Sequence, residues 1–499
     1  MRRNLSQFSR TSRRRRESGQ SLVLVVVAVG LVLAGGMGLA VDTSQLYGHR
    51  QMAQAAADAA AQGGILSIFA RTNTTGSIFG TSTYTCGTSS ATTPCQFAYK
   101  NGVGSTSSDV VSVDFPTSVA GVTLSPNYNP AAIHVLVSRT VAATFMKMLG
   151  AGNTTVKAAA TAAITQTNAV VPIGVMHPTA SGSLSLGGSS SITICGGSQL
   201  SLEVNSSSRT ALSNGGTINL SQAAPCSPTG TGTDLGVFGG PAGPNPADST
   251  VLPSGLTGGS TSHYLQPNLP VSDPLKSISA PTKPATAGTK VSVAKGTPDC
   301  PASLDQSCTI YYPGDWSGGI DVKGETAIFQ PGLYYIDSKG FAFDSNSASV
   351  MCSATCVTSG PLADTTSGCC TTSKGMLVYL DTSGGALSVG ANAGKKDPII
   401  LLGSDKSGTY KGILFFASHS NGSSHSFGGG GATTVTGTLY LTNSALHTQS
   451  LSLGGGSGSN TTIIGQIITD QLSLSGNSAI TMTLDASSTF PVDRVSLVK

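Results

Sequence analysis

The sequence predicts an N-terminal transmembrane α-helix, then a small α/β domain, and then a mainly β region that extends to the end of the chain. Three observations support this prediction. Residues 21–41 are uncharged and almost wholly apolar, residues 42–62 are rich in alanine, and short β-branched runs separated by Gly, Ser and Asn recur from about residue 180. For the β region a parallel β-helix, or solenoid, is favoured, and a β-sandwich is the alternative.

The apolar run has the length of a membrane-spanning helix. About twenty apolar residues cross the hydrocarbon core of a bilayer, and residues 1–20 hold seven Arg and one Glu. Because basic flanks stay in the cytoplasm, we expect a cytoplasmic tail at 1–20, a span at 21–41, and the bulk of the chain in the periplasm or outside the cell. This makes the chain a single-pass protein of an inner membrane.

The net charge of the chain comes from that tail. The whole chain is +4, the first twenty residues are +6, and the remainder is therefore −2. A basic surface for nucleic acid is not indicated, so we expect no nucleic-acid partner.

Two other fates of the N-terminus remain open. A cleaved secretory signal has an apolar core of roughly 7–15 residues, which is shorter than this run. A prepilin-type leader places Gly before the cut and Glu at the fifth mature position. Gly19-Gln20 supplies the glycine, but Leu24 holds the fifth position. A retained anchor is the favoured interpretation.

The alanine-rich stretch predicts that the helix continues past the span, over 42–70. Ala is the strongest helix former, and the glycine pair Gly63-Gly64 is expected to end the helix as a C-cap. Small residues at four-residue spacing, Gly30, Ala34 and Gly38, let helices approach closely in lipid. They predict packing against partner helices.

Residues 71–168 predict a small α/β domain. We expect helices at 96–101 and 141–149, the second amphipathic and ended by Gly150, and strands at 110–115, 133–138 and 154–165. Alternation of apolar and polar residues indicates the strands.

Beyond this domain we expect a β-rich segment at 169–224, a linker at 225–298 and a β-helix-like domain at 299–499. Short runs such as Leu184-Ser-Leu and Leu472-Ser-Leu point alternate side chains inward. Gly/Ser/Asn corners at imperfect repeats favour a β-helix, whereas a sandwich would show more hairpin turns. The linker prediction rests on the 13 of 24 prolines within 225–301.

The even number of cysteines predicts disulfides in an exported chain. Close neighbours suggest Cys86–Cys95, Cys195–Cys226 and Cys300–Cys308, with Cys352, Cys356, Cys369 and Cys370 pairing among themselves. A four-thiolate zinc site is the alternative for the last four, but vicinal Cys369-Cys370 does not fit the usual spacing.

No catalytic, cofactor or metal site is predicted. Four acidic residues of the β region stand singly and are interpreted as solvated turn residues: Asp315, Asp321, Glu325 and Asp337. His419 and His425 flank Asn421-Gly422, which is interpreted as a flexible loop rather than a metal site. No small-molecule substrate is indicated.

The N-terminal module resembles a known family. Its features are the Arg-rich tail, Gly19-Gln20, the apolar span ending at Leu39-Ala40-Val41-Asp42, and the run Gln54-Ala55-Ala56-Ala57-Asp58-Ala59-Ala60-Ala61. Together they resemble the N-terminal module of TadG-like proteins of Flp-pilus (tight-adherence) assembly, related to TadE-type minor pilins. The resemblance covers residues 19–64, and Gln62-Gly63-Gly64 departs from the family's more usual Leu-Ala-Gly.

The resemblance implies a structural role in Flp-type pilus assembly or surface attachment. Its partners would be the membrane and pilus-assembly or pilin-like proteins, contacted through the N-terminal helix. Two alternatives stay open: a membrane-tethered β-helix enzyme acting on glycans, and a surface adhesin unrelated to pili.

Overall fold

A computed structural model gives the fold in two compact units, Met1–Thr165 with Val495–Lys499, and Gln166–Arg494. It describes residues 14–498 except 71–81, 88–89, 105–107, 146, 148–149, 151, 197–199, 225, 227–228, 241–253, 298–299, 301, 303–306, 344–347, 351–374, 392–398, 402–407, 430–432, 444–445, 456–459 and 485–488. Cys352, Cys356, Cys369 and Cys370 lie outside the described residues.

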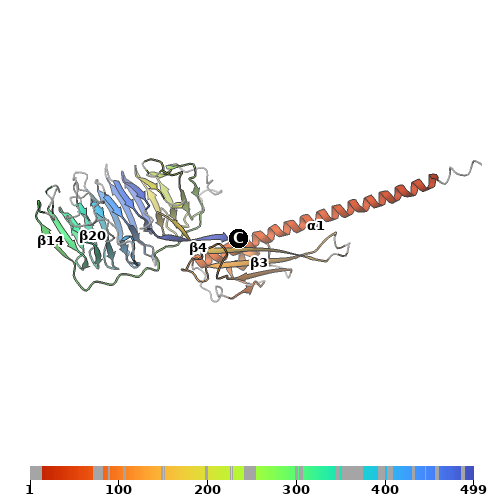
Figure 1. The fold of residues 1–499 in the computed structure, drawn as a ribbon, viewed down its shortest axis with the longest axis horizontal. Helices are drawn as coiled ribbons and strands as arrows, with labels where there is room; N and C mark the ends of the chain where they lie inside the picture. The colour runs from red at the N-terminus through yellow and green to blue at the C-terminus, as the bar shows by residue number, and fades with distance from the viewer. Residues whose placement is uncertain are drawn as a thin grey trace, which may run out of the picture. The chain divides into compact units, whose positions relative to one another are not determined.

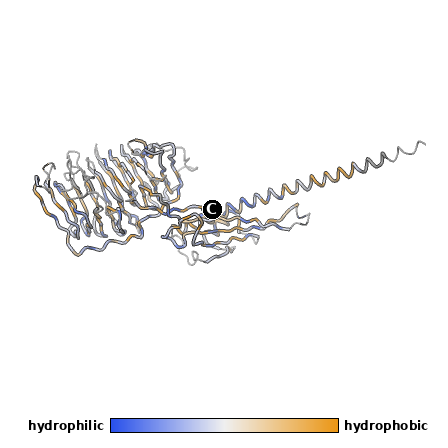
Figure 2. The backbone as a smooth tube through the Cα atoms, in the orientation of Figure 1, coloured by the Kyte–Doolittle hydropathy of each residue, from blue (hydrophilic) through white to orange (hydrophobic). Residues whose placement is uncertain are grey.

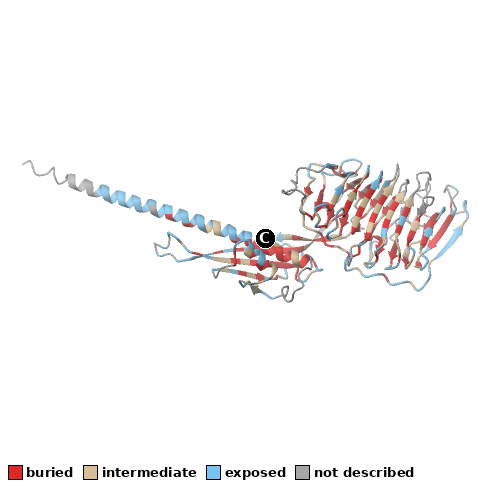
Figure 3. Cartoon of the chain, turned by 180° about the vertical axis from the view of Figure 1, so that it is seen from behind, coloured by how far each residue is buried: buried red, intermediate tan, exposed pale blue. Residues whose placement is uncertain are grey.

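The first unit is organised around one long helix, α1 (Arg14–Ala70), of 57 residues (Figure 1). It confirms a helix through the apolar run and on to residue 70. The expectation that Gly63-Gly64 ends it is wrong, because both glycines lie inside the helix. Figure 2 shows the apolar run as a hydrophobic stretch of this helix, and Figure 3 shows it as exposed.

The rest of the first unit is an antiparallel sheet and a short helix, α2 (Thr93–Lys100), which matches the expected helix at 96–101. Among the described residues the sheet has five strands in the order β1-β2-β3-β4-β34. Their bounds are β1 (Tyr84–Thr85), β2 (Asp109–Asp114), β3 (Ala132–Val141), β4 (Thr154–Val170) and β34 (Pro491–Val498). The three strands expected from alternation correspond to β2, β3 and β4.

The amphipathic helix expected at 141–149 is wrong. Val141 is the last residue of β3, and the described residues between β3 and β4 form the turn that joins these two strands. The apolar residues of this stretch have a helical spacing, but a contact far away in the sequence holds the backbone in another conformation, as described below.

Among its described residues the second unit contains three sheets, of eleven, ten and eight strands. The eleven-stranded sheet has the order β12 (Leu256–Gly258), β10 (Thr217–Leu220), β7 (Ser191–Cys195), β33 (Ala479–Thr483), β30 (Asn460–Ile464), β27 (Thr433–Thr436), β24 (Ile399–Leu401), β21 (Ala348–Val350), β18 (Thr326–Phe329), β15 (Cys308–Tyr312), β14 (Thr289–Val293).

The ten-stranded sheet has the order β13 (Tyr264–Leu265), β11 (Asp234–Val237), β8 (Leu200–Val204), β5 (Ile173–Val175), β31 (Ile467–Thr469), β28 (Thr438–Leu441), β25 (Ile413–Ala417), β22 (Met376–Leu380), β19 (Gly332–Ile336), β16 (Gly314–Trp316). The eight-stranded sheet has the order β17 (Ile320–Val322), β20 (Phe341–Phe343), β23 (Leu387–Ala391), β26 (Ser424–Gly429), β29 (Ser450–Gly455), β32 (Gln471–Gly476), β6 (Leu184–Leu186), β9 (Leu212–Asn214).

Consecutive strands of the second unit go to the three sheets in turn. From β15 to β30 each strand pairs in parallel with the strand three places further along the chain, as β15 with β18, β16 with β19 and β17 with β20. This parallel pairing differs from the antiparallel hairpins expected of the sandwich alternative. The strand β14 pairs antiparallel with β15 at one end of the eleven-stranded sheet.

The first and last strands of the second unit meet inside the sheets. The strands β31, β32 and β33 pair in parallel with β5, β6 and β7. The chain therefore enters the second unit within the stack, builds outward to β12 and β13, passes to the opposite end at β14, and returns strand by strand to the entry point.

The core of the second unit lies between the sheets. In the run Leu184-Ser-Leu186 the two leucines are buried and the serine between them is half-buried. Ser185 is aligned with Ser473, and Ser473 with Ser452, on neighbouring strands. The X-Ser-Leu pattern of the sequence therefore places leucine columns inside and a serine column on the outer face, because side chains alternate along a strand.

The stretch expected as a linker at 225–298 contains the strands β11 to β14. Between β13 and β14, residues 266–288 form a crossing segment that follows the outer face of the ten-stranded sheet. Val271 and Leu275 pack there in one apolar cluster with Tyr379 and Phe416.

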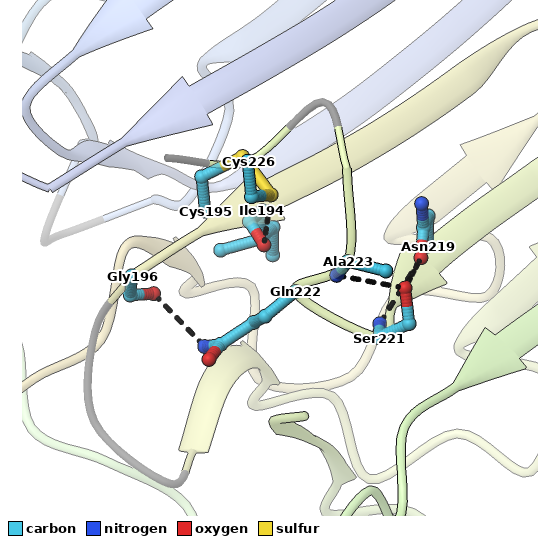
Figure 4. Close-up of a disulfide and its surroundings, with 8 residues drawn as sticks. All are labelled: Ile194, Cys195, Gly196, Asn219, Ser221, Gln222, Ala223 and Cys226. Atoms are coloured by element: carbon cyan, nitrogen blue, oxygen red, sulfur yellow. Dashed lines mark hydrogen bonds between the residues drawn. A yellow bond between two sulfur atoms is a disulfide. The ribbon is translucent and has the colours of Figure 1, made fainter. Parts of the chain in front are cut away.

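Among the described residues the disulfides are Cys86–Cys95, Cys195–Cys226 and Cys300–Cys308, the same pairs that neighbourhood in the sequence suggests. Figure 4 shows Cys195–Cys226 beside the turn at Ser221 and Gln222. The Gln222 amide donates to the Gly196 carbonyl (3.2 Å), so the bridge and this bond hold the turn against the end of β7.

Candidate functional site

The candidate site is the face of α1 that packs against the sheet and α2 within the first unit. From Ala53 onward most of its buried positions recur every three or four residues, as expected of one face of a helix. The buried positions are Gly38, Asp42, Ala53, Ala56, Ala57, Ala60, Ala61, Gly63, Gly64, Ile65, Ile68 and Phe69. Most of these side chains are small, so the helix can approach the sheet and α2 closely.

The glycine pair lies where this approach is closest. A Cβ on Gly63 would lie 2.6 Å from the ring of Phe97 of α2, and one on Gly64 would lie 2.6 Å from Ile133 and 2.8 Å from Pro94. Gly63-Gly64 is therefore a close-packing feature of a continuing helix rather than a C-cap.

Asp42 is the buried charge of this face. Its carboxylate accepts hydrogen bonds from the backbone N–H of Thr144 (3.1 Å) and of Phe145 (3.0 and 3.2 Å to its two oxygens). Asp42 is 4% exposed. We call this arrangement, with Gly38 one turn earlier in the helix, the Asp42 clasp. Hydrogen bonds between charged and neutral groups are stronger than those between neutral groups, so the clasp fixes the β3–β4 turn on α1.

The other residues of the resemblance motif serve the same docking. The Gln54 amide donates to the Asp58 carboxylate (2.8 Å) and to the carbonyl of Ala159 in β4 (3.1 Å). Ala56, Ala57 and Ala60 are fully buried, and Ala59 is half-buried.

Gly19 and Gln20 lie in α1, but their side chains are outside the described set. Gly30 has no neighbour within 4 Å, whereas Gly38 faces Phe145 of the same chain.

Sequence reasoning missed Thr144 and Phe145. They lie more than a hundred residues from Asp42, and they contribute backbone N–H groups, which every non-proline residue has. No residue type in the 142–150 stretch therefore signals the contact.

The acidic residues expected as isolated turn residues have partners. Asp315 and Asp337 both bind the Lys283 ammonium, at 3.2 and 2.6 Å, so the expectation that they are scattered is wrong. These hydrogen bonds raise the pKa of Lys283, Asp337 being the larger cause. Lys283 belongs to the crossing segment, so the cluster attaches that segment to the end of the ten-stranded sheet.

The other two acidic residues also have neighbours. Asp321 pairs with Lys323 (2.7 Å) on the surface. Glu325 accepts hydrogen bonds from the hydroxyls of Thr309 and Tyr311, both 2.6 Å.

The flexible loop expected around His419 and His425 is wrong as well. His425 is fully buried in β26, where its Nδ1 accepts from the Leu387 N–H (3.0 Å) and its Nε2 lies 3.1 Å from Gln449 Oε1. Burial lowers the pKa of His425 to about 4, against a weaker raising effect of Gln449. His419 bonds to the Tyr440 hydroxyl instead (2.8 Å).

A second set of polar residues gathers around Asp470. Its buried carboxylate accepts from the hydroxyl of Thr442, from the N–H groups of Asn443 (2.8 Å) and Gln449 (3.1 Å), and from His447 Nδ1 (3.0 Å). A carboxylate with four donors has few lone pairs left for proton transfer. Among the described residues, no three His, Cys, Asp or Glu side chains are placed to hold a metal ion.

The described part of the chain contains one helix apolar and long enough to cross a membrane, Ser21–Phe69, with a mean hydropathy of 2.7 in its most apolar window. Almost none of that window is buried. The apolar run thus projects from the docked part of α1 with its side chains exposed.

Comparison with known proteins gives one family. Residues 19–65 match the family model described as putative Flp pilus-assembly TadE/G-like. No curated protein sequence matches the chain. Among solved structures, the competence-associated pilin ComZ from Thermus thermophilus aligns with 10% sequence identity and a TM-score of 0.19, over 79% of this chain and 89% of the pilin.

The matched range contains the apolar run, the α1 residues of the Asp42 clasp (Gly38 and Asp42) and the buried alanines of α1. Residues 19–65 are therefore similar to the family described as putative Flp pilus-assembly TadE/G-like.

Proposed function

We propose that the chain is a structural, non-catalytic protein that α1 anchors in the inner membrane, and that it serves Flp-type pilus assembly or surface attachment. The observation that carries the proposal is the division of α1 into an apolar part, exposed at residues 21–33 and 35–37, and a docked part that begins at Gly38. The family match covers both parts. A helix that is apolar on all sides is suited to lipid or to partner helices.

The charge of the N-terminal tail supports an orientation of the chain in the membrane. The seven arginines within residues 1–20 would stay cytoplasmic by the positive-inside rule, which places both folded units in the periplasm or outside the cell. Disulfides such as Cys195–Cys226 are suited to that oxidising compartment.

The second unit would be the displayed part, as a parallel β-helix. Its support is the repeating course of the chain through three parallel sheets, with leucine columns inside and a serine column outside. The carboxylates of Asp315 and Asp337 both bind Lys283 of the crossing segment. This arrangement favours a structural role for them, in attaching the crossing segment to the sheet, over a catalytic role in glycan cleavage.

The test is site-specific cross-linking in cells that carry Flp-type pilus genes. A photoreactive residue replaces Gly30, which is exposed in the apolar run, and a matched control replaces Gly48, in α1 beyond the run; neither glycine has a neighbour within 4 Å. We expect Gly30, but not Gly48, to cross-link to a pilin-like protein, and deletion of the chain to reduce piliation. Normal piliation after deletion, with cross-links to lipid alone, would contradict a role in pilus assembly.

A further inference from the structure

The β3–β4 turn lies beside the end of the apolar run of α1. Asp42, the first residue after the run, holds the N–H groups of Thr144 and Phe145. One helical turn earlier, a Cβ on Gly38 would lie 2.9 Å from Phe145 Cβ. Because a helical turn advances about 5.4 Å, Phe145 lies at the level of the last turn of the run.

The side chains of this turn combine apolar and basic character. Phe145 is 44% exposed although it contacts the helix. The sequence continues Phe-Met-Lys-Met-Leu from 145 to 149, and Lys147 is exposed. Aromatic rings are enriched at the level of the lipid headgroups, and a lysine can lay its methylene stem along apolar surface while its ammonium reaches water or phosphate.

A small pocket lies next to the same contact. Its apolar lining comes from Leu39 and Leu46 of α1 and from Val141, Ala142 and Ala143 at the end of β3, and its polar lining is Asp42, Thr43, Gln45 and Thr154. The pocket therefore has apolar side chains on both the helix side and the sheet side, next to the carboxylate of the Asp42 clasp.

We propose that Phe145 and Lys147 bind the headgroup–acyl boundary of the bilayer that α1 crosses. The occupant is lipid because the apolar run that leads into this contact is exposed, and its last turn and Phe145 lie at one level. Anionic headgroups complement Lys147. The Asp42 clasp then ties the helix to a second point of membrane contact and fixes how deep α1 enters. This inference rests on the proposed anchoring role of α1.

The test uses tryptophan fluorescence in vesicles. The full-length chain with its single tryptophan removed, Trp316→Phe, carries Phe145→Trp and is reconstituted in phosphatidylcholine–phosphatidylglycerol vesicles whose acyl chains are brominated at different depths. We expect blue-shifted emission that the shallowest bromines quench most. The control is Gln96→Trp on α2, at an exposed position of the same unit, which we expect the bromines not to quench.

A third probe separates this inference from the proposed function. Val29→Trp, within the apolar run, should be quenched most by the deepest bromines. If Val29→Trp is quenched while Phe145→Trp emits as in water and is not quenched, the lipid contact of the turn is overturned and the anchor stands. If neither is quenched, the anchor fails and the inference fails with it. Lys147→Trp, at an exposed position, repeats the measurement should Phe145→Trp not fold.

Discussion

At the scale of single residues, hydrogen-bond donors compensate for the burial of two carboxylates, Asp42 and Asp470. Asp42 receives hydrogen bonds from two backbone N–H groups, and Asp470 from four donors. A buried charge without such partners would shift its pKa and become neutral. Glu203 of β8 is a buried carboxyl group whose pKa shifts in this way.

Glu203 predicts a stability that depends on pH. Burial raises its pKa to about 8, although the Asn268 amide (2.8 Å to Oε2) and Arg494 favour the charged form. Among the described residues its Oε1 has no hydrogen-bond partner. The folded state therefore keeps a proton that the unfolded chain loses near pH 4.5. The contribution of Glu203 to the free energy of unfolding is therefore fully present below about pH 4.5, and it is lost as the pH rises through about 8.

Replacing Glu203 with Gln should remove this dependence. We expect Glu203→Gln to be more stable than the wild type at pH 9, by ~5 kcal/mol on the scale of about 1.4 kcal/mol per pKa unit, with little difference at pH 4.5. Urea unfolding at both pH values measures it. Asp321→Asn, at an exposed carboxylate, is the control and should shift stability little at either pH. Parallel pH profiles for the wild type and Glu203→Gln would show that Glu203 does not carry the effect.

At the scale of elements, the docking of α1 depends on glycines, which have no side chain to keep the helix away from its neighbours. Gly64→Ala places a methyl group 2.6 Å from Ile133 and 2.8 Å from Pro94, and overpacking of this kind costs about 1–3 kcal/mol. Gly48→Ala lies in the same helix with nothing within 4 Å, so it should gain up to ~1 kcal/mol of helix propensity. Thermal unfolding should move the two variants in opposite directions. Equal shifts would mean that the glycines matter only for helix propensity.

The crossing segment is a second element that depends on particular bonds. The Tyr440 hydroxyl of β28 donates to Asp273 (2.7 Å). Asn205 bonds to the backbone of Val271, and Tyr410 donates to the Ser279 carbonyl (2.9 Å). With Lys283 at its far end, the segment is attached at successive strands of the ten-stranded sheet.

Removing the Tyr440 hydroxyl should loosen this segment. Burial raises the pKa of Asp273 to about 6, and the hydrogen bond from Tyr440 opposes that shift. Tyr440→Phe therefore leaves a buried carboxylate less satisfied at pH 7.5, at a cost of about 1–3 kcal/mol. Hydrogen exchange at 271–279 should become faster. Tyr312→Phe, at a tyrosine 40% exposed, is the control. Unchanged exchange in Tyr440→Phe would mean that apolar packing alone holds the segment.

At the scale of the whole molecule, the route of the chain predicts cooperative unfolding of the second unit. Stacked repeats that contact only their neighbours can unfold piecemeal. In this unit the first and last strands pair inside the sheets, and the crossing segment links strands near both ends.

Two fluorescent probes at opposite ends test this cooperativity. Trp316, at the β16 end, reports on the wild type, and Tyr264→Trp in a Trp316→Phe background reports on the β13 end. We expect both to give one urea midpoint. Two separate midpoints would show that the ends unfold independently.

The sequence alone determined the features that depend on local composition. The apolar run and the alanine run determined that the helix continues past the span, because alanine is the strongest helix former. Alternation in runs such as Leu184-Ser-Leu186 determined which side chains are buried, because the period of a strand is two. The motif of Gln54 and Asp58 carried the family resemblance for the same reason: it lies within a few turns of one helix.

Only the tertiary structure decided the features that join distant residues. The 141–149 stretch has helical spacing, but Asp42 holds its N–H groups in a turn. Gly63-Gly64 would be a C-cap in isolation, but close packing against α2 and β3 gives it another role. Asp315 and Asp337 are isolated in the sequence until the crossing segment brings Lys283 between them. In each case a long-range contact outweighs a local preference of ~1 kcal/mol per residue, and such a contact leaves no periodic signal in the sequence.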